Sequence, residues 1–469
     1  MSLVAAGGTK WGVELGLLVA AAAVTTLALV SVEISQERTL TGAVGYLGLA
    51  YLGVFGAAHL AVRRWAPYAD PLILPCAALL TGIGLVMIHR LDLAAAVQAI
   101  QQQESPPSAN AIKQIAWAAG SVALLCGFVK LVDDHRRLAR YGYLCGLAGL
   151  VLLVLPGVLP ASISQVNGAK LWIRVGPVSL QPGEFAKILI IIFTAALLVE
   201  KRELFATAGR RVAGMELPRG RDLAPLLIAW LLAVGVLALE KELGASLLFF
   251  GVILAMIYIA TERVSWVVIG LGFFVGASVL AYHLFAHVAV RVHVWQDPLA
   301  DFNDTGYQVS QGLFGLSYGA MMGTGLGAGR PELVPLANTD FIIAALGEEL
   351  GLVGLAAVVM LYLLLISRGL RAAIAAGDSF SKLLAGGLAF SMALQVFIVV
   401  GGVTNLIPET GLTAPFLSYG GSSLLANYLF VALLLRLSHA SRRPPTPRPQ
   451  APPRAPLAAA VTELGTIHR

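Results

Sequence analysis

The chain has 469 residues, of which 58% are hydrophobic and only 12% carry a charge, and its formal net charge is +6. Soluble domains carry roughly 25% charged residues, so this composition excludes an ordinary soluble protein and predicts an all-α polytopic integral membrane protein. Topology and contact with anionic membrane lipids account for the excess positive charge, and we expect no nucleic-acid partner. The three cysteines lie in apolar segments without a CxxC pair, which is typical of small buried hydrophobic residues.

Apolar stretches long enough to cross a bilayer as a helix, about 20 residues, recur along the whole chain. We expect twelve transmembrane helices, near residues 11–32, 43–62, 71–88, 112–132, 141–159, 185–199, 223–239, 244–261, 264–288, 349–366, 383–403 and 415–437. The first stretch lacks a small-residue cleavage site after it, so we interpret it as a retained helix and not as a signal peptide.

Lysine and arginine are distributed unevenly among the connecting segments. With a cytoplasmic N-terminus, most of them fall at the chain ends and in alternate loops, as the positive-inside rule requires. This pattern predicts that both termini are cytoplasmic and that residues 289–340, between the ninth and tenth helices, form a large extracellular loop. Residues 440–469 are rich in Pro and Arg, which is typical of a disordered cytoplasmic tail.

Two short polar blocks fall on the predicted outer side. In the first, 167–187, a Gln-Pro-Gly turn is followed by Glu184, for which helix capping alone is a sufficient explanation. Lys187 lies one turn deeper, and it either serves a site within the bilayer or extends to the lipid headgroups. In the second block, 240–242, we favour a solvated turn as the interpretation of Glu242.

The third block, 291–340, contains Asp297, Asp301 and Asp304, and then four alternating glycines. A loop of this length is uncommon unless it is functional or disordered, and its aromatic residues argue against disorder. The aspartates match no EF-hand spacing, and the glycines are not followed by the Lys-Ser/Thr of a Walker loop. The glycines indicate backbone that passes close to a ligand or to a neighbouring helix.

Acidic residues follow directly after this block. Asp340 and Glu348 are eight residues apart, so they share one face if the whole stretch is helical. Glu348 and Glu349 are intramembrane acids if this helix enters the bilayer, and ordinary solvated acids if it lies on the surface. In the fourth block, 405–423, prolines and glycines interrupt two helices near the outer face. At that depth non-helical backbone is tolerated only where it is buried in protein or lines a cavity. The four blocks together predict a site on the outer face.

Three of these blocks resemble the SEDS family (shape, elongation, division and sporulation), which contains the RodA and FtsW peptidoglycan glycosyltransferases. They are NGAKLWIRVGPVSLQPGEFAK, then WQDPLADFNDTGYQVSQGLFGLSYGAMMGTGLGAG continuing into NTDFIIAALGEELGLVG, and finally NLIPETGLTAPFLSYGGSS. The chain looks RodA-like. The resemblance covers about 141–439, and it implies a ten-helix catalytic domain at 67–439 preceded by a two-helix extension at 1–66.

The resemblance implies polymerisation of lipid II, the undecaprenyl-pyrophosphate-linked precursor, into β-1,4 glycan strands. The reaction would take place at the outer face of the cell inner (cytoplasmic) membrane during cell elongation. Asp301, seven residues before Gln308 of the GYQ motif, matches the essential acid of the family and would act as general base. Glu242 stands where the family more often has Asp, and Gly183 where it often has Ser. A class B penicillin-binding transpeptidase is the implied partner.

We expect the substrate to be bound by Arg174, Glu184, Lys187, Glu242, Gln308, Asp340, Glu349 and Ser418. The pyrophosphate leaving group needs positive charge, which Lys187, Arg174, Arg330 or a divalent cation (Mg or Mn) would supply. No cofactor is certain from the sequence. Two alternatives use the same residues: a lipid II flippase or transporter, against which the apolar middles of most helices argue, and a non-catalytic scaffold for a transpeptidase.

Overall fold

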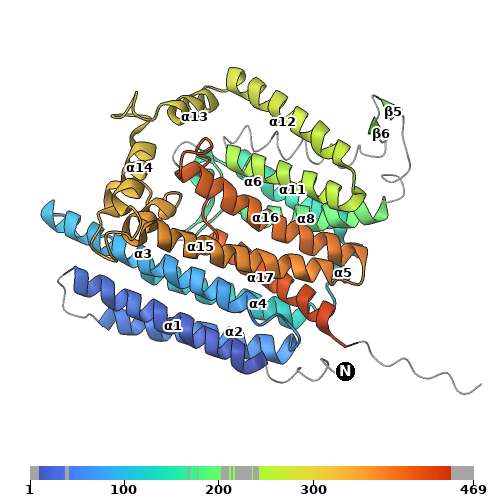
Figure 1. Ribbon diagram of the computed structural model, residues 1–469, viewed down its shortest axis with the longest axis horizontal. Helices are drawn as coiled ribbons and strands as arrows, with labels where there is room; N and C mark the ends of the chain where they lie inside the picture. Colours follow the sequence, from blue (N-terminus) through green and yellow to red (C-terminus); the bar gives the residue numbers. More distant parts are fainter. Residues whose placement is uncertain are drawn as a thin grey trace, which may run out of the picture.

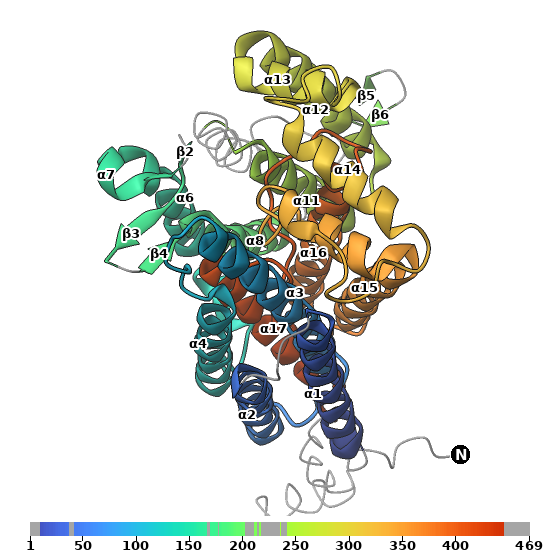
Figure 2. The same ribbon diagram turned by 90° about the vertical axis from the view of Figure 1, so that its left-hand side faces the viewer.

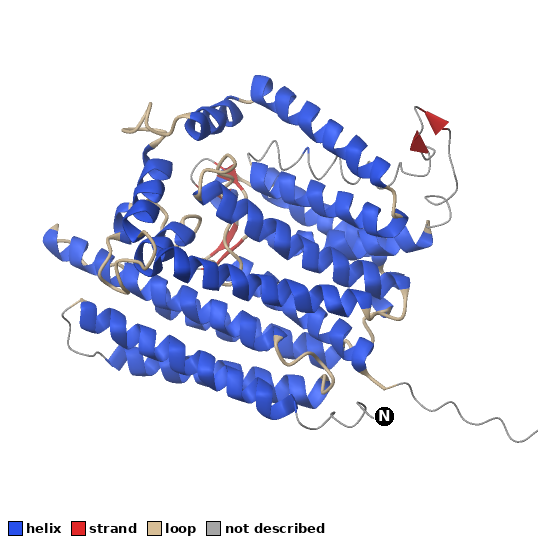
Figure 3. Cartoon of the chain, in the orientation of Figure 1, coloured by secondary structure: helices blue, strands red, loops and turns tan. Residues whose placement is uncertain are grey.

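The structure, a computed structural model, describes residues 10–36, 42–166, 169–176, 178–201, 211–212, 215–216, 235 and 242–444. Most of its long helices run side by side in one bundle (Figure 1). Strands in the described residues are confined to short two-stranded ribbons (Figure 3). This part of the chain has ten helices that are long and apolar enough to cross a membrane, and one shorter apolar helix. The expected all-α polytopic architecture is confirmed.

The helices follow one another along the chain as α1 (Lys10–Ser35), α2 (Gly42–Trp65), α3 (Ile73–Gln101), α4 (Asn110–Leu131), α5 (Arg137–Arg140), α6 (Gly142–Val158), α7 (Ala161–Ser164), α8 (Pro182–Glu200), α11 (Leu243–Thr261), α12 (Val264–Leu284), α13 (Ala286–Gln296), α14 (Tyr307–Gly319), the 3-10 helix η1 (Pro331–Leu333), α15 (Ile342–Ile374), α16 (Ser379–Val403) and α17 (Gly421–Arg442). Three antiparallel ribbons pair β1 (Gln165–Val166) with β2 (Ala169–Lys170), β3 (Ile173–Val175) with β4 (Val178–Leu180), and β5 (Arg211–Val212) with β6 (Met215–Glu216). The expected helix at 223–239 lies outside the described residues, so the total of twelve stays a prediction.

The centre of the bundle is formed by α3 and α17. In each of them 89% of the membrane-length segment is buried by protein, against 6% in α12 at the periphery. Tyr51, Tyr362 and Tyr428 are among the largest fully buried side chains. Tyr51 donates a hydrogen bond to the carbonyl of Ala78, and the hydroxyls of Tyr428 and Thr81 are 2.8 Å apart. The polar ends of these aromatic side chains are therefore satisfied inside the apolar core.

Several boundaries differ from those expected. The third helix does not end near 88 but continues to Gln101, because the charge of Arg90 is paired with protein groups described below. The expected helix 264–288 divides at Phe285, whose extended backbone separates α12 from α13. The block 291–340 is not one continuous loop, since the end of α13, all of α14 and the 3-10 helix lie within it.

The placement of Asp340 on a helix face shared with Glu348 is wrong. Asp340 lies in a turn, and α15 begins two residues later at Ile342. Glu348 and Glu349 do lie in α15, and they are 6% and 1% exposed, so they are buried acids and not solvated ones. Gly351, with φ 68° and ψ −174°, interrupts the helical backbone directly after them and kinks α15.

The two ends of the bundle are chemically different. At one end, on the left in Figure 1, lie α13, α14 and the beginning of α15. This end also carries the interrupted segment 404–420, and we call it the motif end. At the opposite end, basic side chains are found on or beside α4, α15 and α17; they include Lys130, Arg136, Arg368, Arg436 and Arg442. We call this the basic end.

Candidate functional site

Lys187 is buried at the motif end and held by two other helical residues. Its Nζ donates to Oε2 of Glu184 on the same helix, α8 (3.1 Å), and to Oε1 of Gln395 on α16 (2.8 Å). The Nε2 of Gln395 in turn donates to the carbonyl of Thr413 (3.0 Å). A charge at this depth is stable only when it is paired in this way. Lys187 therefore points into the protein, and the interpretation in which it extends to the headgroups is wrong.

Glu242 is linked to Lys187 and Glu184 through Gln181, whose carbonyl accepts a hydrogen bond from the backbone N–H of Glu184 (3.4 Å). Oε1 of Glu242 accepts a hydrogen bond from Nε2 of Gln181 (2.8 Å), and the backbone N–H of Gln181 donates to the hydroxyl of Ser422 at the start of α17 (2.8 Å). Glu242 is half-buried at the first residue before α11, so the solvated-turn interpretation of this residue is wrong. We call Gln181, Glu184, Lys187, Glu242, Gln395, Thr413 and Ser422 the Lys187 network; it joins α8, α11, α16 and α17.

A second buried cluster surrounds Glu349 at the start of α15. Oε1 of Glu349 accepts from Nε of Arg90 on α3 (3.0 Å), and its Oε2 accepts from the backbone N–H of Gly327 (2.9 Å). Arg90 also donates to the carbonyl of Gly329 (2.7 Å). The neighbouring Glu348 accepts from the backbone N–H of Arg330 (2.6 Å). The glycine-rich segment 323–329 is thereby tied to both α15 and α3.

The glycines of this segment pass very close to α15. A Cβ on Gly323 would lie 2.2 Å from the carbonyl oxygen of Glu349, and Gly323 also has a positive φ of 81°. A side chain is therefore excluded there by both space and backbone conformation. Of the two explanations that the sequence left open for these glycines, the structure supports close approach to a neighbouring helix.

Ser418 shapes the interrupted segment between α16 and α17. Its hydroxyl donates to the carbonyl of Thr339 (2.6 Å) and accepts from the backbone N–H of Ala414 (2.8 Å). The side chain of Gln114, on α4, donates to the Ser418 carbonyl (3.1 Å). The polar backbone of this non-helical segment is thus satisfied by protein groups, as is required at membrane depth.

Asp301 lies in the turn between α13 and α14 and is exposed. Its Oδ2 accepts from the hydroxyl (2.7 Å) and from the backbone N–H (3.3 Å) of Thr305. Gln308, in the first turn of α14, donates to the carbonyl of Pro335 (3.1 Å). The turn is anchored through α13, because Trp295 and Asn405 exchange two hydrogen bonds of 3.0 and 3.1 Å. Asp301 is therefore an accessible carboxylate on an anchored turn at the motif end.

The structure brings only some of the sequence candidates together. Glu184, Lys187 and Glu242 share one network, whereas the side-chain hydrogen bonds that the structure gives for Asp301 go to Thr305. Arg174 is exposed on β3, and Figure 2 shows the β3–β4 ribbon on the opposite side of the bundle from α14. Among the described residues, no three His, Cys, Asp or Glu side chains are grouped to hold a metal ion.

Comparison with known proteins shows the family to which this chain belongs. Residues 70–443 match the family model of FtsW, RodA and SpoVE proteins, described as cell cycle proteins. The chain belongs to the FtsW/RodA/SpoVE family. The predicted resemblance is confirmed, and this family member is a multi-pass membrane protein.

Relatives match this FtsW/RodA/SpoVE protein over nearly its whole length. It is 56% identical over 456 residues to the peptidoglycan glycosyltransferase RodA of Mycobacterium tuberculosis, which covers 97% of this chain and 96% of that one. It is 52% identical, over the same shares, to the RodA of Mycobacterium leprae. A solved structure from a peptidoglycan synthase complex, described as coordinating polymerization and crosslinking, matches with a TM-score of 0.62 and 26% identity over 80% of this chain and 98% of that one.

Arg90, Gln395 and Gln114 bind the candidate residues but were missed in the sequence. Gln395 is a polar residue inside an apolar span, and this alone could have marked it. Arg90 lies two residues beyond the expected end of the third helix, where a positive charge is unremarkable. No pattern in a single sequence shows that Arg90 meets Glu349, because the two are 259 positions apart.

Asp340 is half-buried in the turn before α15, outside the membrane-spanning segment. Burial raises the pKa of Asp340 to about 7, the Glu409 carboxylate adds to the rise, and the Arg291 guanidinium opposes it. Arg291 is itself bound to the carbonyl of Glu409 (3.0 Å) and lies 3.6 Å from its carboxylate. Asp340 therefore changes its charge near neutral pH beside the anchor of α13.

This shift makes the stability of the protein depend on pH. Between the unfolded pKa of about 4 and the folded pKa near 7, the folded state binds the Asp340 proton and the unfolded state does not, so folding stability falls as pH rises. An Asp340→Asn variant has no carboxyl group at this position, so its folding stability does not fall in this way as the pH rises. We expect its melting temperature relative to the parent to be higher at pH 8 than at pH 5, measured by thermal unfolding in detergent.

The matched control is Asp304→Asn, which removes one negative charge from an exposed aspartate of a neighbouring turn and so reports the effect of the charge alone. An Asp340→Asn difference from the parent that is the same at pH 5 and pH 8 would contradict the raised pKa.

Proposed function

We propose that this chain is a RodA-type peptidoglycan glycosyltransferase that polymerises lipid II into β-1,4 glycan strands during cell elongation. The proposal is supported by relatives of that name that are up to 56% identical over 97% of the chain. The structural observation that carries the mechanism is the accessible carboxylate of Asp301, on a turn anchored at the same end of the bundle as the buried Lys187 network.

Asp301 is the general base of the proposed reaction. The 4-hydroxyl oxygen of the acceptor sugar attacks the anomeric carbon of the donor and transfers its proton to the carboxylate, a step that a positioned base within hydrogen-bond reach accelerates. The bond from the anomeric carbon to the pyrophosphate oxygen breaks, and the electron pair leaves with the pyrophosphate. Direct displacement inverts the α-linked donor to a β-1,4 linkage. Thr305 restrains the carboxylate through two hydrogen bonds to Oδ2.

The leaving pyrophosphate carries negative charge, which preorganised positive groups stabilise. Lys187 has three N–H donors, and two of them are used by Glu184 and Gln395, so one remains for a substrate oxygen. Arg330 presents a side chain that is 73% exposed beside the glycine-rich segment. Arg174, on the far side of the bundle, is the weaker candidate for this role. The described residues offer no ready site for Mg or Mn.

We further propose that the motif end faces outward from the cytoplasmic membrane and that both termini are cytoplasmic. The support is the concentration of Lys and Arg at the basic end, which the positive-inside rule assigns to the cytoplasm. Residues 1–66 would form an extension, 67–439 the catalytic domain, and 440–469 a cytoplasmic tail. A class B penicillin-binding transpeptidase is the proposed partner, since a similar chain is found in a complex described as coordinating polymerization with crosslinking.

The experiment that tests the activity uses the purified full chain in liposomes with fluorescent lipid II. The parent should produce ladders of glycan polymer, and Asp301→Ala should lose about 10²–10⁴-fold in rate, the usual contribution of general acid–base catalysis. Translocation of lipid II without polymer would show that the chain is a flippase and not a glycosyltransferase. If the parent gives neither polymer nor translocation, alone or with a transpeptidase added, the remaining interpretation is a non-catalytic scaffold.

A further inference from the structure

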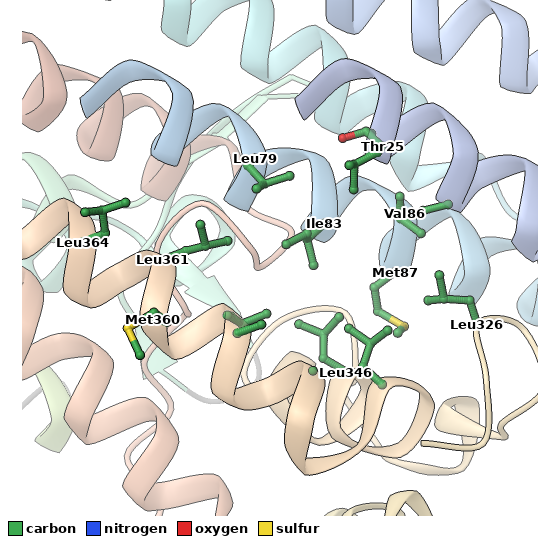
Figure 4. A pocket seen from close by; sticks show the side chains of 16 residues that line it. Thr25, Leu79, Ile83, Val86, Met87, Leu326, Leu346, Met360, Leu361 and Leu364 are labelled. Atoms are coloured by element: carbon green, nitrogen blue, oxygen red, sulfur yellow. The ribbon is translucent and has the colours of Figure 1, made fainter. Parts of the chain in front are cut away.

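An apolar cavity of about 470 Å³ lies between α1, α3 and α15. Figure 4 shows Thr25 of α1, Ile83 and Met87 of α3, and Leu346 and Leu361 of α15 pointing toward it. The polar member of this lining, Thr25, donates its hydroxyl hydrogen bond to the carbonyl of Ala21 (2.8 Å), so it offers a ligand no free donor. Among the residues that the structure describes, no charged side chain lines the cavity, and none of the nine predicted site residues does. Its chemistry therefore fits a hydrocarbon.

The cavity lies beside the kink in α15. Its lining on this helix runs from Leu346 to Leu364, on both sides of the kink at Gly351. A Cβ on Gly351 would lie 2.3 Å from the backbone nitrogen of Gly323, so the kink is held in place by the glycine-rich segment. Leu326 of that segment closes the cavity near the motif end. The glycine-rich segment therefore fixes both the kink and one end of the cavity wall.

The shape of the cavity restricts what can occupy it. At 1.5 Å per residue, the lining runs about 12 Å along α3, from Leu79 to Met87, and at most ~27 Å along the kinked α15, from Leu346 to Leu364. A volume of about 470 Å³ spread over such lengths leaves a cross-section on the order of 20–40 Å². A transmembrane helix has a diameter of about 10 Å and does not fit. One extended hydrocarbon chain does.

The edges of the cavity open toward the surrounding lipid. Val24 on α1 and Met360 on α15 line it and are 52% and 64% exposed. On the opposite wall, Val86 and Met87 of α3 are 4% and 0% exposed, so this wall is covered by protein. A chain can enter laterally from the bilayer while its headgroup stays outside.

We propose that this cavity binds one fatty acyl chain of a bilayer phospholipid, held between α1 and the core helices α3 and α15. The α1 wall precedes residue 70, where the family match begins, so the site is partly built by the N-terminal extension. In this proposal the bound acyl chain packs against Leu326 of the glycine-rich segment. The next residue, Gly327, accepts a hydrogen bond from Gln36 at the end of α1 and donates one to Glu349. This site does not depend on the proposed glycosyltransferase activity.

The test uses the full chain in nanodiscs whose phospholipid carries a photoactivatable diazirine in one acyl chain. After irradiation, labelled residues are identified by mass spectrometry. Val86 is the reporter, because it lines the α3 wall of the cavity and is only 4% exposed, so lipid around the outside of the protein does not cover it. Two variants fill the cavity from opposite walls, Ala28→Phe and Ala357→Phe. The control is Ala356→Phe, which adds the same side chain to the adjacent exposed position of α15 outside the cavity.

The proposal expects label on Val86 in the parent and in Ala356→Phe. In both filling variants the label should fall about tenfold or more, the factor given by the loss of about two methylenes of buried contact. Thermal unfolding of each variant confirms that it is folded. Absence of label on Val86 in the parent, or equal label in all variants, would overturn the proposal. Displacement of the label by added polyprenyl pyrophosphate would also overturn it, since the occupant would then be a polyprenyl chain.

Discussion

Lys187→Met is expected to lower the rate of glycan polymerisation by about 10²–10³-fold, the loss seen when a preorganised group that stabilises developing charge is removed. The methionine side chain has a similar length but no charge and no N–H donor. The substitution removes the N–H donor that we propose for the leaving pyrophosphate. It also leaves the buried carboxylate of Glu184 without its cation at 3.1 Å. The rate is measured with fluorescent lipid II in liposomes.

The same helix provides the control for this change. Lys201, directly after the other end of α8, forms an ion pair with Glu200 (3.3 Å) in which both side chains are substantially exposed. Lys201→Met should retain the parental rate within about twofold, because an exposed pair contributes only ~0–1 kcal/mol. Gln395→Leu tests whether the position of the Lys187 ammonium matters as well as its charge. It keeps the ammonium but removes the Gln395 oxygen that orients it. Its rate should lie between those of Lys187→Met and Lys201→Met. Parental activity in Lys187→Met would remove this residue from the mechanism.

Glu349→Gln is expected to destabilise the protein by about 3–5 kcal/mol, the usual result of leaving one member of a buried ion pair without its partner. Arg90 is 3% exposed and Glu349 is 1% exposed, and their side chains meet at 3.0 Å. Glutamine preserves the shape of the side chain but leaves the guanidinium with less compensating charge. Since Glu332 lies further from Arg90, at 3.4 Å, it restores only part of this charge. Denaturant titration in mixed micelles measures the loss.

A second substitution distinguishes the ion pair from simple loss of packing. Arg90→Met combined with Glu349→Met removes both charges and should be more stable than either single variant, because two apolar groups of similar volume often replace a buried pair with little loss. Arg136→Met breaks a 2.9 Å pair with Asp378 in which Arg136 is 58% exposed, and it should cost less than about 1 kcal/mol. Equal losses in Arg136→Met and Glu349→Gln would contradict the buried-pair interpretation.

Hydropathy alone predicted most of the bundle, because each span must be apolar to lie in lipid. The interruption between α16 and α17 was visible as well, since Pro408, Pro415 and the glycine pair after Tyr419 cannot continue a helix. The predicted helix boundaries were wrong where a charged side chain binds protein groups in place of water. Arg90 would end a helix exposed at a membrane surface, but here its charge is satisfied inside the fold and α3 continues past it.

The individual site residues were predictable as candidates but not as a constellation. Lys187 and Glu184 are three residues apart on one helix, so their pairing follows from local geometry. The third member, Gln395, is 208 positions from Lys187, and only the packing of α16 against α8 brings it there. Glu242 was assigned to solvent because nothing near it in sequence shows that Gln181 will reach it. Pairings between distant helices are set by tertiary packing, which periodicity does not report.

The two buried clusters have different places in this account. The Lys187 network joins α8, α11, α16 and α17 around a buried cation, whose third N–H donor is the one we propose for the leaving pyrophosphate. The Arg90–Glu349 cluster is closed by its own hydrogen bonds and fixes the glycine-rich segment against α15. We therefore expect the first to control the reaction rate and the second to control stability.

The proposed role of Asp301 is tested most directly by comparing Asp301→Asn with Asp304→Asn in the same liposomes, with lipid II at saturating concentration. Both aspartates are exposed on the same turn, so the pair differs in position and not in the charge removed. Asp301→Asn should polymerise about 10²–10⁴-fold more slowly than the parent, whereas Asp304→Asn should stay within a few-fold of it. Similar rates in the two variants would show that the carboxylate of Asp301 does not take the proton from the acceptor sugar.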